Sequence, residues 1–299
     1  MPSLESDELN RSPISDPLTY PGKRADGNYL MVEEWLYHLA PQRGSGVGDW
    51  VLGIDGGPLR RAAGSARPHL DLHRALRKAK AAPMDQRVPV LAIGSNASPG
   101  QMLHKLSRPP RVPGVIPVTR GLVRGLAIGH AAHVSRPGYV PYVAVSAGPG
   151  RSRVRRSLAV LWLDEQQLER TDQTEPNYEL VSIDGGRHQL MLDSGETLGR
   201  YGLFRGRYGA LRGEDGGRLV EATTQASVLS LLSGHEWFRA LVPAGDPVEI
   251  VERLRTDGGL REEVKRQMAA RGLGCDDGIG ARAEGPDALL GPFRRRAGA

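Results

Sequence analysis

The stretch VPVLAIGSNASPGQM, residues 88–102, combines the features of a buried strand, a tight loop and the start of a helix. Apolar residues dominate positions 88–93, which is typical of a strand buried on both faces. Ser98 suits a helix N-cap, Pro99 suits the first helical position, and Gln101 completes a capping box with Ser98. The pattern predicts a strand, a short loop and a helix that begins at Pro99.

The loop between these two elements consists of Gly94, Ser95, Asn96 and Ala97. Backbone N–H groups at a helix N-terminus lack partners, and together with the helix dipole they attract an anion. Gly94 permits a tight turn or a close approach of the backbone to a ligand. The loop is therefore a candidate anion-binding site, although an ordinary connection between strand and helix has the same pattern.

A second segment, LWLDEQQLERTDQTEPNYELV, has the same order of strand and helix. Asp164 is the predicted N-cap of its helix, and Gln167 completes the capping box. The helix is expected to end near Thr174, because Glu175 precedes Pro176 and the residue before a proline avoids the helical region. Glu175 is thus held in extended backbone just beyond a helix. It is a candidate general base if it lies near the loop, and an ordinary surface carboxylate otherwise.

The rest of the chain is rich in strands at its centre and in helices towards both ends. Short segments separated by glycine and proline turns predict antiparallel strands, and apolar residues at helical spacing predict helices on either side. This arrangement predicts the α+β class. The expected strands are 114–130, 138–146, 156–163, 178–184, 189–192 and 198–204, and the expected helices are 28–40, 69–80, 223–232, 236–241, 247–255 and 260–271.

The composition fits a globular chain of one or two domains. The 299 residues are 39% hydrophobic and 25% charged, and no apolar run approaches the roughly 18 residues that a membrane helix needs. The N-terminus lacks the apolar core of a secretory signal, and Cys275 is the single cysteine. We therefore expect a cytoplasmic protein without disulfides and without a membrane partner.

The formal charge of +6 comes mainly from arginine, since all but five of the 40 basic residues are arginine. A basic chain can bind nucleic acid, but here the charge is dispersed and no basic motif is interleaved with aromatic residues. The composition, rich in arginine, glycine and alanine, is more typical of a GC-rich genome. We expect no nucleic-acid partner, and the sequence leaves the oligomeric state open.

Taken together and in this order, the two segments resemble the gamma-glutamylcyclotransferase family over about residues 88–206. The family has a Tyr-Gly-Ser-Asn loop after its first strand, and positions 93–96 read Ile-Gly-Ser-Asn here. The family later has a Leu-Asp-x-x-Glu motif that is followed by a tyrosine. The matching residues are TDQTE at 171–175 and the nearby Tyr178.

Three positions depart from the family pattern. Ile93 stands where the family has the loop tyrosine, so that hydroxyl is absent. Thr171 stands where the family has leucine, and Pro176 stands where glycine commonly follows the catalytic glutamate. The first change alters the expected fit of the substrate, and the last is expected to stiffen the loop.

The resemblance implies a small mixed, mainly antiparallel β-barrel of the gamma-glutamylcyclotransferase type with flanking helices. We accordingly divide the chain into five parts. They are a disordered N-terminus over 1–28, a helical N-terminal extension over 29–87, the catalytic domain over 88–220, a C-terminal helical region over 221–271 and a loose basic tail over 272–299.

The reaction that the resemblance implies is an intramolecular aminolysis of a small-molecule γ-glutamyl substrate. The α-amine attacks the γ-carbonyl, 5-oxoproline closes, and the distal amine leaves. Glu175 is the implied general base and acid, and no metal or organic cofactor is required. The implied substrate-binding residues are Ile93, Gly94, Ser95, Asn96, Ala97 and Tyr178.

Three other functions stay open at this point. The first is a non-catalytic, ligand-binding or regulatory member of the same fold, which the loss of the loop tyrosine favours and the presence of Glu175 opposes. The second is a basic partner-binding protein. The third is a different acyl transfer or lyase reaction on a γ-glutamyl or related amide.

Overall fold

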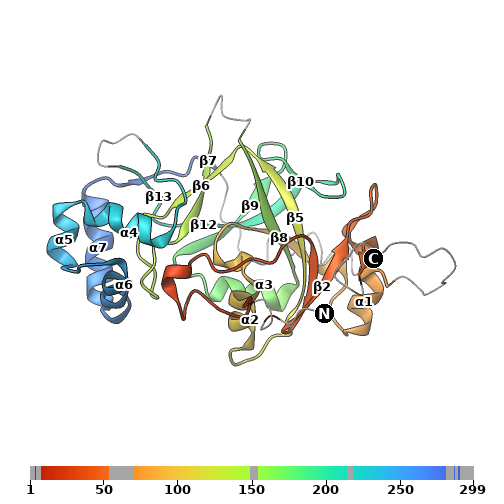
Figure 1. Cartoon of the computed structure of the whole chain (residues 1–299). Coiled ribbons are helices and arrows are strands. Elements are labelled where there is room, and N and C mark those ends of the chain that lie inside the picture. The colour runs from red at the N-terminus through yellow and green to blue at the C-terminus, as the bar shows by residue number, and fades with distance from the viewer. Residues whose placement is uncertain are drawn as a thin grey trace.

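The computed structural model describes residues 4, 8–53, 70–148, 154–213, 218–280, 286 and 289. Within these residues the chain is a mixed α+β protein, in which seven α-helices accompany a mainly antiparallel sheet. Figure 1 shows the sheet at the centre and the four C-terminal helices gathered on one side of it. The α+β class predicted from the sequence is confirmed.

The main sheet contains one parallel pair among the strand pairs that the structure describes, and the others are antiparallel. In spatial order the strands are β3 (Val51–Leu52), β2 (Trp35–Ala40), β1 (Tyr29–Val32), β5 (Val115–Arg124), β8 (Arg155–Leu163), β4 (Val88–Ala92), β12 (Arg200–Gly206) and β9 (Tyr178–Asp184). β10 (Leu190–Leu192) pairs with β5 and with β11 (Thr197–Leu198). Across the described residues these pairings form an open path and not a closed barrel.

Two small sheets and two groups of helices complete the described structure. β6 (Leu126–His130) pairs with β7 (Tyr142–Ser146), and β13 (Ala210–Leu211) pairs with β14 (Gly274–Cys275). The helices beside the main sheet are α1 (Leu72–Lys78), α2 (Pro99–Ser107) and α3 (Glu165–Gln173). The helices that pack around a separate apolar core are α4 (Gln225–Ser233), α5 (Glu236–Leu241), α6 (Pro247–Thr256) and α7 (Gly258–Ala270). The predicted C-terminal helices are thus confirmed, with small shifts at their ends.

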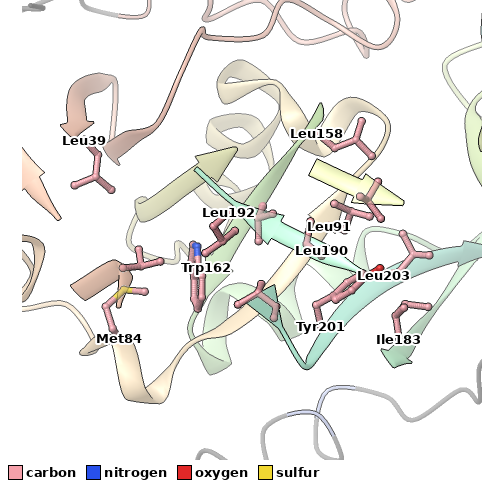
Figure 2. Close-up of a cluster of buried hydrophobic side chains, with 14 of the residues drawn as sticks. Leu39, Met84, Leu91, Leu158, Trp162, Ile183, Leu190, Leu192, Tyr201 and Leu203 are labelled. Atoms are coloured by element: carbon pink, nitrogen blue, oxygen red, sulfur yellow. The ribbon is translucent and has the colours of Figure 1, made fainter. Parts of the chain in front are cut away.

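β4 is buried along its whole length. β8 and β12 pair with its two edges, and its side chains enter two apolar clusters, Leu91 in one and Val88, Val90 and Ala92 in the other. Leu91 of β4 belongs to the same apolar cluster as Trp162 of β8 and Leu203 of β12 (Figure 2). Burial of a large apolar side chain contributes about 1.5–3 kcal/mol. The indole N–H of Trp162 donates to the hydroxyl of Thr119 at 3.0 Å, so this polar atom is satisfied inside the core. The loop after β4 therefore starts from a firmly packed strand.

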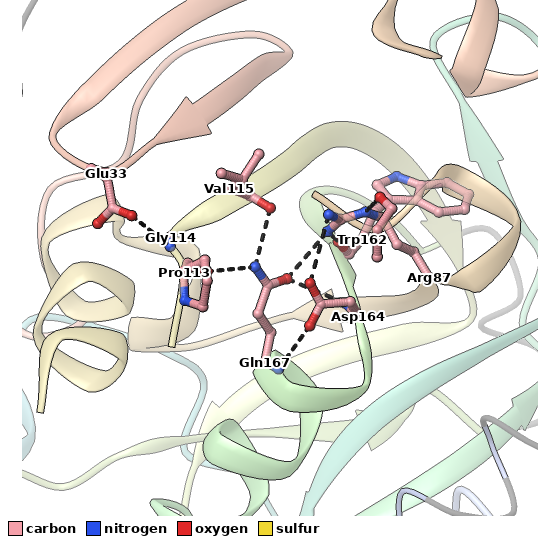
Figure 3. Close-up of polar contacts among 9 residues, drawn as sticks. Glu33, Arg87, Pro113, Gly114, Val115, Trp162, Asp164 and Gln167 are labelled. Atoms are coloured by element: carbon pink, nitrogen blue, oxygen red, sulfur yellow. Dashed lines mark hydrogen bonds and ion pairs between the residues drawn. The ribbon is translucent and has the colours of Figure 1, made fainter. Parts of the chain in front are cut away.

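A buried polar network holds the start of α3 against the sheet (Figure 3). Arg87 is fully buried and donates to the carbonyl oxygen of Trp162 at 2.9 Å and to Oε1 of Gln167 at 3.2 Å. Its guanidinium lies 3.7 Å from the carboxylate of Asp164, the N-cap of α3. Burial lowers the pKa of Arg87 to about 10, and the charge of Asp164 opposes this shift. Arg87 therefore stays charged and paired at neutral pH.

Gln167 joins this network to the strand that lies beside it. Its Nε2 donates to the carbonyl oxygens of Pro113 at 2.8 Å and Val115 at 3.1 Å (Figure 3). The predicted capping box is present, because Asp164 and Gln167 exchange side-chain and backbone hydrogen bonds. The helix that leads to Glu175 is thus fixed at its first turn.

The helix predicted over residues 28–40 is wrong. The segment forms β1 and β2, an antiparallel hairpin in whose turn Glu33 has a positive φ of 52°. β1 also pairs with β5, and the side chain of Asn28 accepts a hydrogen bond from the backbone N–H of Arg120 at 2.6 Å. Pairing with β5 outweighs the helical spacing of the apolar residues, and a local pattern does not contain that information. The extension that was expected to be helical therefore begins with strands of the main sheet.

Both chain ends differ from the prediction where the structure describes them. In the N-terminal segment, expected to be disordered, Leu4, Leu9 and Tyr20 are buried. In the tail, expected to be loose, Leu273 and Ile279 are buried and β14 pairs with β13. A few apolar anchors suffice to dock segments whose overall composition is polar. Most of the tail after residue 280 lies outside the described residues.

The capping box predicted at the start of α2 does not form. Oε1 of Gln101 accepts from the hydroxyl of Ser12 at 2.6 Å, whereas the buried hydroxyl of Ser98 has no hydrogen-bond partner in the structure described. α2 nevertheless begins at Pro99 as predicted. A contact with the N-terminal segment has therefore replaced a local cap.

Candidate active site

The order of the strands brings the two predicted motifs to one edge of the sheet. β4 and β12 are parallel, so both strands end at this edge. β9 is antiparallel to β12 and pairs Tyr178 with Gly206, so β9 begins at the same edge. The loop after β4 and the residue Glu175 just before β9 therefore meet, although Asn96 and Glu175 are 79 positions apart in the chain.

Asn96, Lys105 and Glu175 form a closed set of three hydrogen bonds. Nδ2 of Asn96 donates to Oε1 of Glu175 at 2.9 Å, and Nζ of Lys105 donates to the same oxygen at 2.5 Å. Nζ of Lys105 also donates to Oδ1 of Asn96 at 2.8 Å. The side chain of Lys105 is 4% exposed and that of Glu175 is 16% exposed. Oε2 of Glu175 has no partner among the described residues, which leaves it able to accept a proton from a ligand.

The loop presents free backbone donors beside this set. Within the short 3₁₀ turn η4 (Ser95–Ala97), the N–H groups of Ala97 and Ser98 donate to the carbonyl oxygens of Gly94 and Ser95. The N–H groups of Ser95 and Asn96 have no acceptor in the part of the chain that the structure describes. Fixed N–H donors of this kind stabilise negative charge. The site thus combines a carboxylate that can take a proton with donors that can hold an oxyanion.

These groups line a cavity of about 720 Å³, a volume within the range of small-molecule sites. Its walls come from segments that are far apart in the sequence. The lining residues are Ile14 and Tyr20 of the N-terminal segment, residues 91–96, Gln101, His104, Lys105 and Arg108 of α2 and its end, Ser135, Arg136, Pro137, Tyr139, Pro141 and Tyr142 before and at the start of β7, residues 173–178, Phe204 and Arg255 of α6. The cavity therefore depends on the terminal regions as well as on the strand-rich middle.

Four tyrosines form an aromatic wall of the cavity, namely Tyr20, Tyr139, Tyr142 and Tyr178. The ring of Tyr20 stacks on Tyr139 with centroids 4.2 Å apart and meets Tyr142 edge-on at 5.1 Å. Burial raises the pKa of Tyr20, Tyr139 and Tyr178, and the charge of Glu175 raises each of them further. These phenols stay protonated at neutral pH, so they act through hydrogen bonds and not as bases.

The N-terminal segment holds the loop from the side of the cavity. Nη2 of Arg24 donates to the carbonyl oxygen of Ile93 at 3.0 Å. The hydroxyl of Tyr20 accepts from the backbone N–H of Tyr142 at 2.9 Å and lies so close to Gly94 that a Cβ at position 94 would collide with it. Glycine is needed here because a side chain of the N-terminal segment occupies the space.

The structure brings together all but one of the residues predicted for the site. Ile93, Gly94, Ser95, Asn96, Glu175 and Tyr178 line the cavity. Ala97 does not line it, and its side chain is buried in the apolar core instead. The hydroxyl of Tyr178 donates to the carbonyl oxygen of Tyr142 at 2.9 Å, so this side chain supports the wall.

Sequence reasoning missed several residues that the structure adds to the site. Lys105 had the clearest signal in the sequence for a role in the site, because it lies on the buried face of α2 together with Met102 and Leu106. A lysine on the apolar face of a helix needs a buried partner, and Glu175 provides it. Tyr20, Tyr139 and Arg255 carried no such local signal, because only the tertiary fold brings them to the cavity.

Two further features of the described residues bear on the kind of site. They contain no group of three or more His, Cys, Asp or Glu side chains arranged to hold a metal ion. In the same residues, no helix combines the length and the apolar character needed to cross a bilayer.

No protein-family model, no curated protein and no solved structure matches the chain. The function is therefore inferred from the residues around the cavity.

Proposed function

We propose that the protein is a gamma-glutamylcyclotransferase-like enzyme that releases 5-oxoproline from a γ-glutamyl amide. The observation that carries the proposal is the hydrogen bond between Asn96 and Glu175 in one cavity. It joins the two segments on which the resemblance rests, and these segments are far apart in the chain. A small-molecule γ-glutamyl substrate is the partner that this reaction requires.

Glu175 is the proposed base because Asn96 and Lys105 hold its Oε1, while its Oε2 has no partner among the described residues. Oε2 accepts a proton from the α-ammonium, which frees the nitrogen lone pair for attack on the γ-carbonyl carbon. The new C–N bond closes a five-membered ring. Holding one flexible chain in the ring-closing conformation supplies much of the rate enhancement in such a reaction.

The N–H groups of Ser95 and Asn96 are the proposed donors to the oxyanion that forms on the γ-carbonyl oxygen. The γ-carbon–nitrogen bond then breaks. As this bond breaks, Glu175 gives the departing nitrogen the proton that it took from the α-ammonium. The carboxylate then takes a second proton from the ring nitrogen, and the released amine takes up that proton. The products are 5-oxoproline and a protonated amine, so atoms and charge balance without a metal or an organic cofactor.

Tyr20 supplies a phenol hydroxyl near the position at which the loop tyrosine is missing. Ile93 carries no hydroxyl, and the phenol of Tyr20 reaches the backbone of Gly94 from the N-terminal segment. We infer that this phenol fills the part of the site that the family pattern assigns to the loop side chain. The same resemblance leads us to propose that the open sheet corresponds to the family's small barrel, and that the protein acts in the cytoplasm.

The test measures release of 5-oxoproline from a panel of γ-glutamyl amino acids and γ-glutamyl amines by mass spectrometry. Glu175→Gln keeps the shape of the side chain but removes the base, and we expect kcat to fall by at least about 100-fold. Glu169→Gln is the matched control, because Glu169 is exposed on α3 and does not line the cavity. Equal loss in both variants, or no loss in Glu175→Gln, would contradict the assignment of the base.

A non-catalytic ligand-binding protein of the same fold is the second candidate. The ion pair between Lys105 and Glu175 favours it, because the Lys105 ammonium competes with a substrate ammonium for the carboxylate. This candidate predicts saturable binding of γ-glutamyl compounds in calorimetry together with no release of 5-oxoproline. Turnover that depends on Glu175 would exclude it.

A further inference from the structure

The cavity has a strongly unequal distribution of charge. Among the described residues that line it, Glu175 carries the one carboxylate, whereas Lys105, Arg108, Arg136 and Arg255 are cationic. Lys105 is paired with Glu175. The three arginines have no carboxylate partner within the described part of the chain, and all three are exposed. Glu175 neutralises the charge of Lys105, so the positive charges of the three arginines are not neutralised by a carboxylate of the described residues.

The fold brings Arg136 and Arg255 to the same wall. Arg136 lies in a turn in which the N–H of Gly138 donates to the carbonyl oxygen of Ser135 and the N–H of Ser135 donates to the carbonyl oxygen of Tyr139. Gly138 has a φ of 97°, and a Cβ there would collide with the carbonyl oxygen of Val251 in α6 and lie 3.4 Å from Cβ of Arg255. The turn thus packs directly on the last turns of α6, which carries Arg255 to the cavity.

The end of α6 does not need Arg255 as a cap. Nη1 of Arg261 donates to the carbonyl oxygens of Leu254 at 2.6 Å and Arg255 at 3.0 Å. A guanidinium already neutralises the exposed carbonyls of the last turn. The side chain of Arg255 is left to face the cavity without a structural partner among the described residues.

Arg108 is likewise available to an anion. Its Nη2 lies 2.6 Å from Nε2 of His104. Burial lowers the pKa of His104, and the charges of Arg108 and Lys105 lower it further. His104 is therefore neutral near pH 7 and accepts this hydrogen bond, which leaves the positive charge of Arg108 uncompensated.

Unpaired guanidinium groups beside a cavity attract anions and bind carboxylate or phosphate through paired N–H donors. We propose that Arg136 and Arg255 select γ-glutamyl substrates whose released amine bears its own carboxylate or phosphate. This inference rests on the proposed function and names the part of the substrate that the sequence left open. The terminal helical region thereby acquires a role, since α6 supplies half of the anion-binding wall.

The test compares substrates that differ in the distal anion alone. γ-Glutamylglycine carries a carboxylate that γ-glutamyl methylamide lacks, and γ-glutamyl-O-phosphoethanolamine carries a phosphate that γ-glutamylethanolamine lacks. The readout is the ratio of the two kcat/KM values within each pair, measured by product release. We expect wild type to favour the anionic member of at least one pair by about 10-fold or more, a factor that corresponds to 1.4 kcal/mol. The pair with the larger ratio identifies carboxylate or phosphate as the natural group.

The variants Arg136→Gln and Arg255→Gln assign the preference to this wall. Each is expected to reduce the ratio by about 10-fold, mainly through KM. Arg253→Gln is the matched control, because Arg253 is exposed in the same last turn of α6 and does not line the cavity. It should keep the wild-type ratio, and high salt should lower the ratio in wild type.

The outcomes separate this inference from the proposed function. Turnover of both members of each pair at the same rate, or an equal effect of all three variants, would overturn the inference and leave the cyclotransferase activity intact. No release from any substrate would overturn the proposed function. In that case calorimetric titration with the same pairs decides the inference, since tighter binding of the anionic members that depends on Arg136 and Arg255 supports it and its absence overturns it.

Discussion

At the residue scale, Glu175 and Lys105 put two opposite charges into a site that water reaches only in part. The ammonium of Lys105 is nearly buried and donates to both Glu175 and Asn96. A charge in such surroundings is tolerated because it is paired and hydrogen-bonded. Lys105 is thus a positioning residue, since it fixes Oε1 of Glu175 and leaves Oε2 for the substrate.

Replacement of Lys105 by methionine is expected to lower the free energy of unfolding by about 3 kcal/mol, because it leaves the Glu175 carboxylate without its main partner. The measurement is urea unfolding at pH 7. In the double variant Lys105→Met, Glu175→Gln, no charge is left unpaired, so a large part of the loss should be recovered. Losses that simply add in the double variant would show that the two residues are not coupled.

His133 makes the stability of the fold depend on pH. It is 1% exposed, and neither ring nitrogen has a hydrogen-bond partner in the structure described. Burial, together with a smaller effect of the charge of Lys265, lowers the pKa of His133 to about 3. Between this value and the ordinary pKa of about 6.5 the unfolded chain binds a proton that the folded chain does not. The contribution of His133 to stability is therefore present above pH 6.5 and is lost as the pH falls towards 3.

For one site with these pKa values, the loss between pH 7 and pH 5 is on the order of 2 kcal/mol. The variant His133→Phe keeps an aromatic ring beside Tyr208 but cannot take up the proton. Its urea unfolding free energy should change less between pH 7 and pH 5 than that of wild type, by about this amount. The same pH dependence in both proteins would refute the role of His133.

At the scale of elements, α3 positions Glu175 beside the loop that follows β4. Arg87, Asp164 and Gln167 fix its first turn (Figure 3), and Glu175 follows its last turn. Displacement at the start of a short helix is transmitted to its end, because the helix is a rigid element. The network around Arg87 is thus connected to the site, although none of its members lines the cavity.

The variant Arg87→Met removes a fully buried guanidinium, which is the ion-pair partner of Asp164 and the donor to the carbonyl oxygens of Ala82 and Trp162. We expect a loss of about 3–5 kcal/mol in the free energy of unfolding. Arg77 of α1 is exposed, and its side chain has no partner among the described residues, so Arg77→Met is the matched control. A loss in Arg87→Met no larger than that of the control would contradict the structural role of the network.

The comparison of elements shows which features a sequence pattern can predict. The capping box of Asp164 and Gln167, the end of α3 and the start of α2 depend on neighbouring residues, and these predictions agree with the structure. The hairpin of β1 and β2 depends on pairing with β5, so helical spacing gave the wrong element. The cap at Ser98 failed for a similar reason, because Ser12 binds Gln101 from the N-terminal segment.

At the scale of the whole molecule, the two terminal regions meet at the cavity. The N-terminal segment contributes Tyr20, and α6 contributes Arg255. Leu18 of the turn η1 (Pro17–Thr19) also packs against the apolar core of the C-terminal helices. This part of the site was beyond prediction from sequence, because it arises from contacts between opposite ends of the chain.

Tyr20→Phe tests whether the N-terminal segment belongs to the site. The change leaves the backbone N–H of Tyr142 without its acceptor and removes the hydroxyl beside Gly94. We expect stability to fall by about 1 kcal/mol. We also expect the catalytic efficiency, kcat/KM, to fall by about 10-fold, a loss of roughly 1.4 kcal/mol in transition-state stabilisation. Tyr37→Phe is the control, because Tyr37 lies in β2 and does not line the cavity. Equal kinetic effects of the two variants would remove Tyr20 from the site.

The proposed function depends above all on Glu175, which takes the proton in an intramolecular ring closure. The decisive experiment follows the release of 5-oxoproline from γ-glutamylglycine by wild type and by Glu175→Gln at equal concentrations, with thermal unfolding curves to verify that both proteins are folded. We expect release by wild type and a loss of at least about 100-fold in the variant. Absence of release by wild type, or undiminished release by the folded variant, would contradict the proposal.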